Sequence, residues 1–204
     1  MSLSTVERVE QRVRQGLLRG DYPPGAWLRQ DDLASELGVS KIPVREALQR
    51  LAAASLVTFE PNRGALVRPL AAADAEEIFA LRQALEPKLL RRAIGRQTTV
   101  DLATAELALT SGSLPLTEAN WLFHRALYHA ASWPRALAIV ETLHTAVAPY
   151  VLLYTESLGG ATHSDMEHRE LLDYCRAGDA RSAARVLRGH LLAAASALAA
   201  YLSA

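Results

Sequence analysis

The chain has 204 residues, of which 50% are hydrophobic and 22% are charged, a composition that supports buried cores and argues against disorder. The chain has 22 Lys and Arg and 22 Asp and Glu, so its net charge does not indicate a class of binding partner. Its single cysteine excludes an internal disulfide framework. The amino-terminal residues alternate charged with apolar side chains, and no uninterrupted apolar run reaches the ~18 residues of a spanning helix. We therefore expect a cytoplasmic protein with no membrane partner.

The first third of the chain combines short helices with a hairpin. Apolar residues at helical spacing predict a helix over residues 4–19, and two prolines at 23 and 24 then force a turn. A short helix is predicted over 31–39 and a third over 41–54, with Ser40 as a favourable N-cap. The runs LVTFE and ALVRP flank residues 61–64 and predict a β-hairpin. This order is typical of a winged helix-turn-helix.

From Asp74, expected to cap the next helix, the sequence predicts helices only. Their ranges are 74–95, 99–110, 116–131, 134–157, 164–177 and 179–202. The fold class is therefore mostly α, with a winged helix-turn-helix over residues 1–70 and an all-α helical bundle over 71–204. Charge barely distinguishes these domains, because the first holds ten Lys and Arg against eight Asp and Glu. Histidine distinguishes them sharply, since all six lie in the second domain.

The helix predicted at 41–54 carries basic side chains near its amino terminus. Lys41 and Arg45 are four residues apart and share one face. The amino-terminal end of a recognition helix is the part that reaches base edges, and the Arg fork matches guanine O6 and N7. An isolated pair of this kind is more often a solvated helix face, whereas its place within the full ordered motif favours DNA contact.

The motifs of residues 23–67 occur in the order PPG, LA, LGVS, PVREAL, RL and NRGA. This region resembles the winged helix-turn-helix of the GntR family of transcription factors. The segments ALRQALEP (80–87), NWLFHRAL (120–127), EHRELLDYCRAGD (167–179) and GHL (189–191) resemble the all-helical FCD-type effector domain of its FadR branch, in the shorter six-helix VanR-like variant.

The resemblance implies contacts with double-stranded DNA at five positions. Ser40, Lys41 and Arg45 would contact bases and backbone, while Arg63 and Gly64 at the wing tip would reach the minor groove, Gly64 allowing close approach to the DNA backbone. Many relatives carry Arg at position 41, and some carry a basic residue at position 31 in place of Asp. One winged domain covers only a half-site, so we expect a homodimer on a palindromic operator.

The histidines suggest a metal site. Asn120 and His124 lie four apart on one helix, and His168 and His190 lie on two consecutive helices. Three imidazoles and one oxygen donor suit Zn²⁺, Ni²⁺ or Mn²⁺. On spacing alone, packed or surface histidines are the competing interpretation. The resemblance implies a site with one carboxylate and three histidines, in which Asn120 stands where Asp is common, so a metal-free effector domain is the alternative.

A metal with an open coordination position could bind a small carboxylate effector. Arg82, in the segment ALRQALEP, is our candidate for a second anchor of that acid, and a structural ion pair with Glu86 at i+4 is an equal alternative. His129, His144 and His163 have no motif support and are interpreted as ordinary residues, although His144 could line the cavity.

The sequence therefore predicts a ligand-responsive transcription regulator, and within that class a repressor. The alternative from another class is a metalloenzyme whose three histidines hold a water-activating metal. No HExxH motif and no Ser/His/Asp or Cys/His set accompanies these histidines, so we expect no enzymatic activity.

Overall fold

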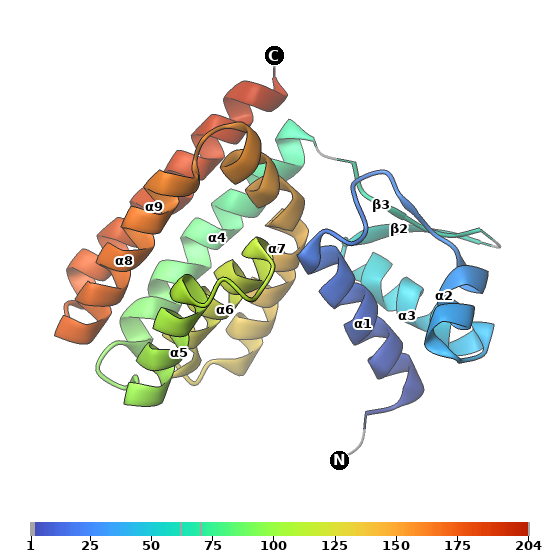
Figure 1. Cartoon of the computed structure of the whole chain (residues 1–204), viewed down its shortest axis with the longest axis horizontal. Coiled ribbons are helices and arrows are strands. Elements are labelled where there is room, and N and C mark those ends of the chain that lie inside the picture. The colour runs from blue at the N-terminus through green and yellow to red at the C-terminus, as the bar shows by residue number, and fades with distance from the viewer. Residues whose placement is uncertain (1–2, 62, 70, 204) are drawn as a thin grey trace. The chain divides into compact units, whose positions relative to one another are not determined.

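The computed structural model describes residues 3–61, 63–69 and 71–203, and the chain divides into two compact units, Met1–Leu70 and Ala71–Ala204. Asn62 in the predicted turn and Leu70 at the predicted domain end lie outside the described residues. The predicted fold class is confirmed: helices dominate both units, and the small sheet lies in the first (Figure 1).

Three helices form most of the first unit. Helix α1 (Thr5–Arg19) begins at a capping box in which Ser4 and Glu7 bond each other's backbone amides. Helix α2 (Gln30–Leu37) ends at Gly38, which adopts a left-handed φ of 63°. Helix α3 (Lys41–Ala53) packs against α1 through a buried face. The predicted helices are therefore present, with ends that differ by one or two residues.

A three-stranded antiparallel sheet completes this unit. Strands β2 (Val57–Glu60) and β3 (Gly64–Val67) form the predicted hairpin, and β1 (Trp27–Leu28) pairs with the other side of β3. The sequence did not predict β1, because two residues are too short to show an alternating pattern. The strand order β1-β3-β2 ties the wing to the segment that enters α2.

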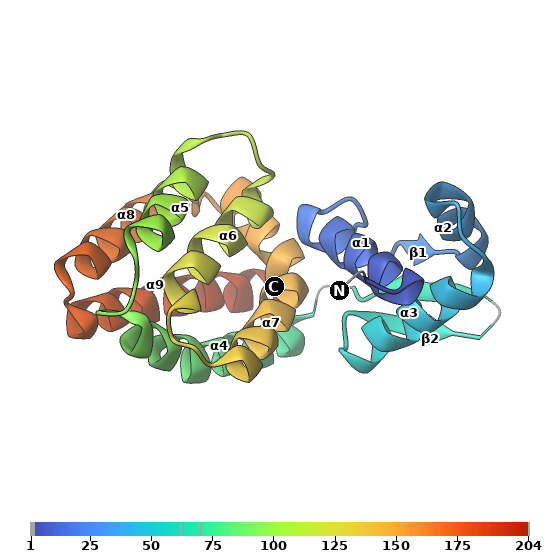
Figure 2. The ribbon, with the colours of Figure 1, turned by 90° about the horizontal axis from the view of Figure 1, so that it is seen from below.

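The second unit is a helical bundle. Within the described residues it holds α4 (Ala72–Ala93), α5 (Thr99–Thr110), α6 (Leu116–His129), α7 (Pro134–Leu152), α8 (Ala161–Ala177) and α9 (Ala180–Leu202). Helix α9 packs against α4 and α8 (Figure 1), and α6 packs against α4, α5 and α7 (Figure 2). The predicted cap at Asp74 is wrong, because Ala71 occupies the N-cap and Asp74 lies in the first turn.

Helix α7 departs most from the prediction of one helix over 134–157. It ends at Leu152 and continues as a π-helical turn over Leu153–Ser157, and α8 begins at Ala161, earlier than predicted. Pro134–Ser157 is also long and apolar enough to cross a membrane by length and composition alone, which the search for uninterrupted apolar runs did not detect. Core helices of water-soluble proteins pass the same test, and α7 packs against α4 and α6.

Candidate functional site

The amino-terminal end of α3 presents its polar residues to solvent. Val44 and Ala47 bury the opposite face of the helix completely, so Lys41 and Arg45 point outward. Ser40 occupies the N-cap position with an extended backbone, but its side chain makes no capping hydrogen bond, contrary to expectation. The exposed start of α3 is thus held by the apolar face of the helix rather than by its cap.

The two basic residues of α3 differ in their surroundings. The Nζ of Lys41 lies 2.6 Å from Asp31 Oδ1, and both side chains are mostly exposed. Arg45 makes no hydrogen bond or ion pair with any part of the chain that the structure describes. Arg45 is therefore free to engage an external acceptor, whereas Lys41 must first leave Asp31.

The wing residues also have internal partners. Arg63 Nη1 lies 3.5 Å from Glu60 Oε2 across an exposed pair. Gly64 has a φ of 121°, and a Cβ at this position would lie 2.1 Å from the carbonyl oxygen of Leu28. Gly64 is therefore required for the close approach of β3 to strand β1 of the same unit, and its expected role in approaching DNA stays a prediction.

A surface hollow joins these elements and adds residues that the sequence interpretation missed. Lys41 and Arg63 line it together with Trp27 and Arg29, which lie on β1 and directly before α2. Asp31 and Asp32 line the same hollow and make its charge mixed. A basic residue immediately before the first helix of the helix-turn-helix was the available signal for Arg29.

In the second unit, three predicted metal ligands come together. His124 on α6, His168 on α8 and His190 on α9 each offer a ring nitrogen, and these nitrogens lie within 4.8 Å of one another. All three side chains are largely buried. Residues that lie 44 and 22 positions apart in the sequence thus share one cluster, which we call the histidine trio.

The unsatisfied atoms of the trio fit a metal ion. Nε2 of His124 and Nε2 of His168 are buried without a hydrogen-bond partner among the described residues, and such atoms in a native structure need an explanation. Nδ1 of His190 lies 2.9 Å from Glu167 Oε2, so its Nε2 remains as the ligand atom. Ligating histidines usually donate their other N–H to a carboxylate in this way.

A buried polar network lies behind His124. Tyr128 donates its hydroxyl proton to Glu86 Oε2 at 2.7 Å, and the same hydroxyl lies 3.1 Å from Nδ1 of His124. Glu86 Oε1 also contacts Arg82 Nε at 2.5 Å and lies 3.3 Å from His144 Nε2. With its hydrogen donated to Glu86, the Tyr128 oxygen accepts from His124 Nδ1–H, which leaves Nε2 unprotonated and facing the trio.

Burial and charge set the protonation states of this network. Burial lowers the pKa of His124 and His168 well below the ordinary value, and the neighbouring histidines lower it further. Burial also lowers the pKa of His144, to about 4. For Glu86, burial would raise the pKa, but Arg82 and His144 outweigh it and hold the pKa well below its usual range. His124, His144 and His168 are thus neutral, and Glu86 remains a carboxylate.

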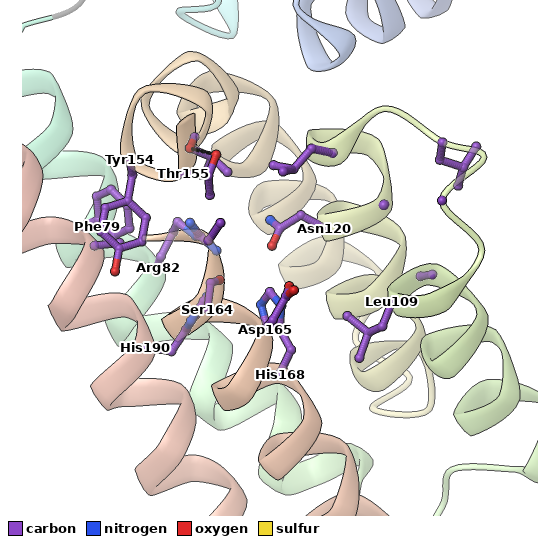
Figure 3. Close-up of a pocket in the computed structure, with 18 residues that line it drawn as sticks. Phe79, Arg82, Leu109, Asn120, Tyr154, Thr155, Ser164, Asp165, His168 and His190 are labelled. Atoms are coloured by element: carbon purple, nitrogen blue, oxygen red, sulfur yellow. Dashed lines mark hydrogen bonds between the residues drawn. The ribbon is translucent and has the colours of Figure 1, made fainter. Parts of the chain in front are cut away.

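A cavity of about 270 Å³ opens beside the trio, and Figure 3 shows the side chains that surround it. His168 and His190 line it, as do the predicted fourth ligand Asn120 and the predicted effector anchor Arg82. Arg82 makes the ion pair with Glu86 and also lines the cavity, and its role as an effector anchor stays a prediction. Asp165, one turn before His168, lies at the cavity and was not predicted.

Several residues around the trio escaped sequence reasoning. Tyr128 lies at i+4 from His124, a spacing that could have identified it, and Glu167 directly precedes His168. His144, interpreted as ordinary, is 2% exposed, and its ring centroid lies 5.2 Å from that of His124. The distances that join these residues to the trio come from helix packing, which the sequence does not encode locally.

Each of the two units matches a known protein family. Residues 5–67 match the family model "Bacterial regulatory proteins, gntR family", and residues 77–193 match "FCD domain". The latter match covers more than half of the chain. The chain belongs to the GntR family of transcription regulators with an FCD domain.

Individual relatives support the same assignment. The HTH-type transcriptional regulator McbR of Escherichia coli is 29% identical over 78% of this chain and 76% of its own length. BphR of Paraburkholderia xenovorans, also an HTH-type transcriptional regulator, is 30% identical over 92% and 82%, respectively. A probable D-xylose utilization operon transcriptional repressor of Paenarthrobacter nicotinovorans is 29% identical over 93% and 87%.

A solved structure extends the likeness to the fold. The structure of E. coli McbR/YncC superposes with a TM-score of 0.84, at 26% identity, over 97% of this chain and 98% of that chain. These relatives and this fold are those of transcription regulators, so the chain is a regulator and not an enzyme. The metalloenzyme alternative is thereby set aside.

Proposed function

We propose that this GntR-family regulator is a repressor that binds a palindromic operator as a homodimer and is controlled by a small carboxylate effector held at a divalent metal. The observation that carries the proposal is the pairing of an exposed basic helix start in one unit with a buried histidine trio beside a cavity in the other. Differential binding of the effector to two arrangements of the dimer would change operator affinity.

For DNA recognition, the supporting geometry is the outward start of α3. Arg45 is exposed and has no partner in the part of the chain that the structure describes, and it would read a base in the major groove. Ser40 and Lys41 would contact the phosphate backbone, and Arg63 and Gly64 would meet the minor groove at the wing. A repressor role agrees with the description of the Paenarthrobacter relative as a probable transcriptional repressor.

For the metal, the supporting observation is the set of unpartnered ligand atoms. His124, His168 and His190 would hold the ion through Nε2, with the amide oxygen of Asn120 as a weak fourth donor. The ion, Zn²⁺, Ni²⁺ or Mn²⁺, would supply a positive charge with an open position for a carboxylate oxygen. Neighbouring side chains would prepare two of the ligands for the ion. The Tyr128 hydroxyl accepts from Nδ1–H of His124 and so leaves Nε2 of His124 unprotonated, and Glu167 orients the His190 ring.

Two measurements on the untagged full-length protein test the proposal. Selection from a random pool of duplex DNA should enrich a palindrome, bound by two protomers with an affinity that falls steeply between 50 and 200 mM salt, about 10³-fold for some six phosphate contacts. Elemental analysis after dialysis against Zn²⁺, Ni²⁺ or Mn²⁺ should find one equivalent per chain. A pool without enrichment would contradict the DNA proposal, and less than half an equivalent of each metal would contradict the metal proposal.

A further inference from the structure

The cavity beside the trio is polar at one end and apolar over most of its wall. His168 and His190 lie at the polar end, and Asn120 points into the cavity nearby (Figure 3). The remaining wall is largely aliphatic and comes mainly from α5, α6 and the segment between them, including Ala108, Leu109, Leu114, Leu116 and Ala119. A ligand in this cavity therefore meets metal-binding groups at one end and hydrocarbon along its body.

The cavity-lining hydroxyl groups of Tyr154, Thr155 and Ser164 come from the π-helical turn and α8, and none belongs to the aliphatic wall from α5 and α6. Thr155 in the π-helical turn already donates its hydroxyl proton to the carbonyl of Val151 at 2.8 Å. Leu109 faces the cavity from α5 (Figure 3), where a ligand hydroxyl would lose water without a replacement partner. Burying an unpaired hydroxyl costs about 1–3 kcal/mol, so a sugar acid fits this wall poorly.

The charges around the cavity favour a ligand with one carboxylate. Arg82 is the cation among the cavity-lining side chains that the structure describes, and Glu86 already compensates it at 2.5 Å. Asp165 adds a negative charge at the cavity. The metal proposed at the trio is thus the principal source of uncompensated positive charge, and a second carboxylate would meet Asp165 without a cationic partner.

We propose that the effector is a small monocarboxylic acid with an apolar chain or ring, its carboxylate at the trio-bound metal and its apolar body against the wall formed by α5 and α6. This inference rests on the proposed metal site and narrows the effector class. The cavity volume of about 270 Å³ lies below the ~300–1,000 Å³ of sites for drug-sized ligands, which limits the acid to a small molecule.

A homologous series of straight-chain acids tests this class. Acetate, butyrate, hexanoate and octanoate are titrated by calorimetry into the Zn²⁺-loaded full-length protein, with gluconate and succinate as the hydroxylated and doubly charged comparators. Each added CH₂ should tighten binding about fourfold, the equivalent of ~0.8 kcal/mol per methylene, until the cavity is full. Hexanoate should bind tighter than either comparator.

A pair of variants on α5 locates the apolar body. Leu109→Asn should weaken hexanoate about tenfold, because it places an amide in the apolar wall, and should leave zinc stoichiometry and acetate binding unchanged. Leu107→Asn is the matched control, since Leu107 lies on the same helix, is 60% exposed and does not line the cavity. Thermal melting of both variants verifies that each is folded.

The possible outcomes distinguish a failure of the proposed effector class from a failure of the proposed metal site. Zinc-loaded protein that binds gluconate or succinate more tightly than hexanoate, or that binds all acids of the series equally or not at all, would overturn the inference and leave the metal site standing. Equal loss of hexanoate binding in both α5 variants would also overturn it. Protein that takes up no metal would overturn the proposed metal site and the carboxylate anchor with it.

Discussion

The two candidate sites differ in the burial of their polar side chains. In the amino-terminal unit, the ion pairs Lys41–Asp31 and Arg63–Glu60 lie in solvent, and Arg45 has no partner within the described chain. In the carboxy-terminal unit, Arg82, Glu86 and His144 are buried and bonded to one another. Residues of the first kind can change partners at little cost, whereas those of the second kind are committed before any ligand arrives.

The largest expected difference between the two units is the loss of stability when a paired carboxylate is removed. Glu86→Gln should lower the free energy of unfolding by about 3–5 kcal/mol, because it leaves the buried Arg82 without its counter-charge. Glu60→Gln, which breaks the exposed pair with Arg63, should cost no more than about 1 kcal/mol. Urea unfolding of both variants gives the two values, and similar losses would remove the distinction between the units.

The next effect concerns the histidine trio. His168→Gln should weaken zinc binding more than ~100-fold, since loss of an outer-shell partner alone costs 10–100-fold. His129→Gln is the control, because His129 is exposed and pairs with Asp101 outside the trio. Competition with a chromophoric chelator measures both affinities. A control that loses as much affinity as His168→Gln would show that the ion binds elsewhere.

A smaller effect is expected for DNA reading. Arg45→Ala should weaken operator binding by about 1–3 kcal/mol and relax preference at one base pair, while stability changes by no more than ~0.5 kcal/mol because the side chain is exposed and unpaired. Fluorescence anisotropy with the selected duplex and its single-base variants measures operator affinity and base preference, and thermal melting measures stability. Unaltered operator affinity would place base reading on other residues.

The smallest effect tests the exposed pair at α3. Asp31→Asn should tighten DNA binding by about 0.2–1 kcal/mol, because Lys41 no longer has to leave a carboxylate to reach a phosphate. The gain should shrink as salt is raised, since exposed charges are screened. Anisotropy titrations at 50 and 200 mM salt distinguish this from a structural effect, which would be the same at both concentrations.

Local patterns predicted the fold because each element carries its own signal. The apolar spacing of residues 4–19 and the β-prone runs around 61–64 do not depend on distant residues, so both were identified. Strand β1 and the π-helical turn at Leu153–Ser157 were missed because pairing or backbone geometry defines them. The N-cap predicted at Asp74 was wrong because the prediction required a side chain that can cap. The helix in fact begins after Ala71, which has no such side chain.

The candidate site was predictable only in part. The family resemblance implied the three histidines, and the structure brings them within 4.8 Å. The sequence placed Arg82 opposite Glu86 by i+4 spacing, but the participation of Tyr128 and His144 depends on the packing of α4, α6 and α7. Which polar groups share a buried network is a tertiary property, and a list of local spacings does not contain it.

The contact at Gly64 restricts how this regulator can diversify. Any side chain at position 64 must displace the Leu28 carbonyl, so substitution would separate β3 from β1 before it altered recognition. We therefore expect neighbours such as Arg63, whose side chain is 74% exposed, to tolerate substitution better than Gly64. On the proposed DNA interface, we expect altered operator preference to arise by substitution at Arg63 and on the outer face of α3, because such changes leave the β1–β3 contact at Gly64 intact.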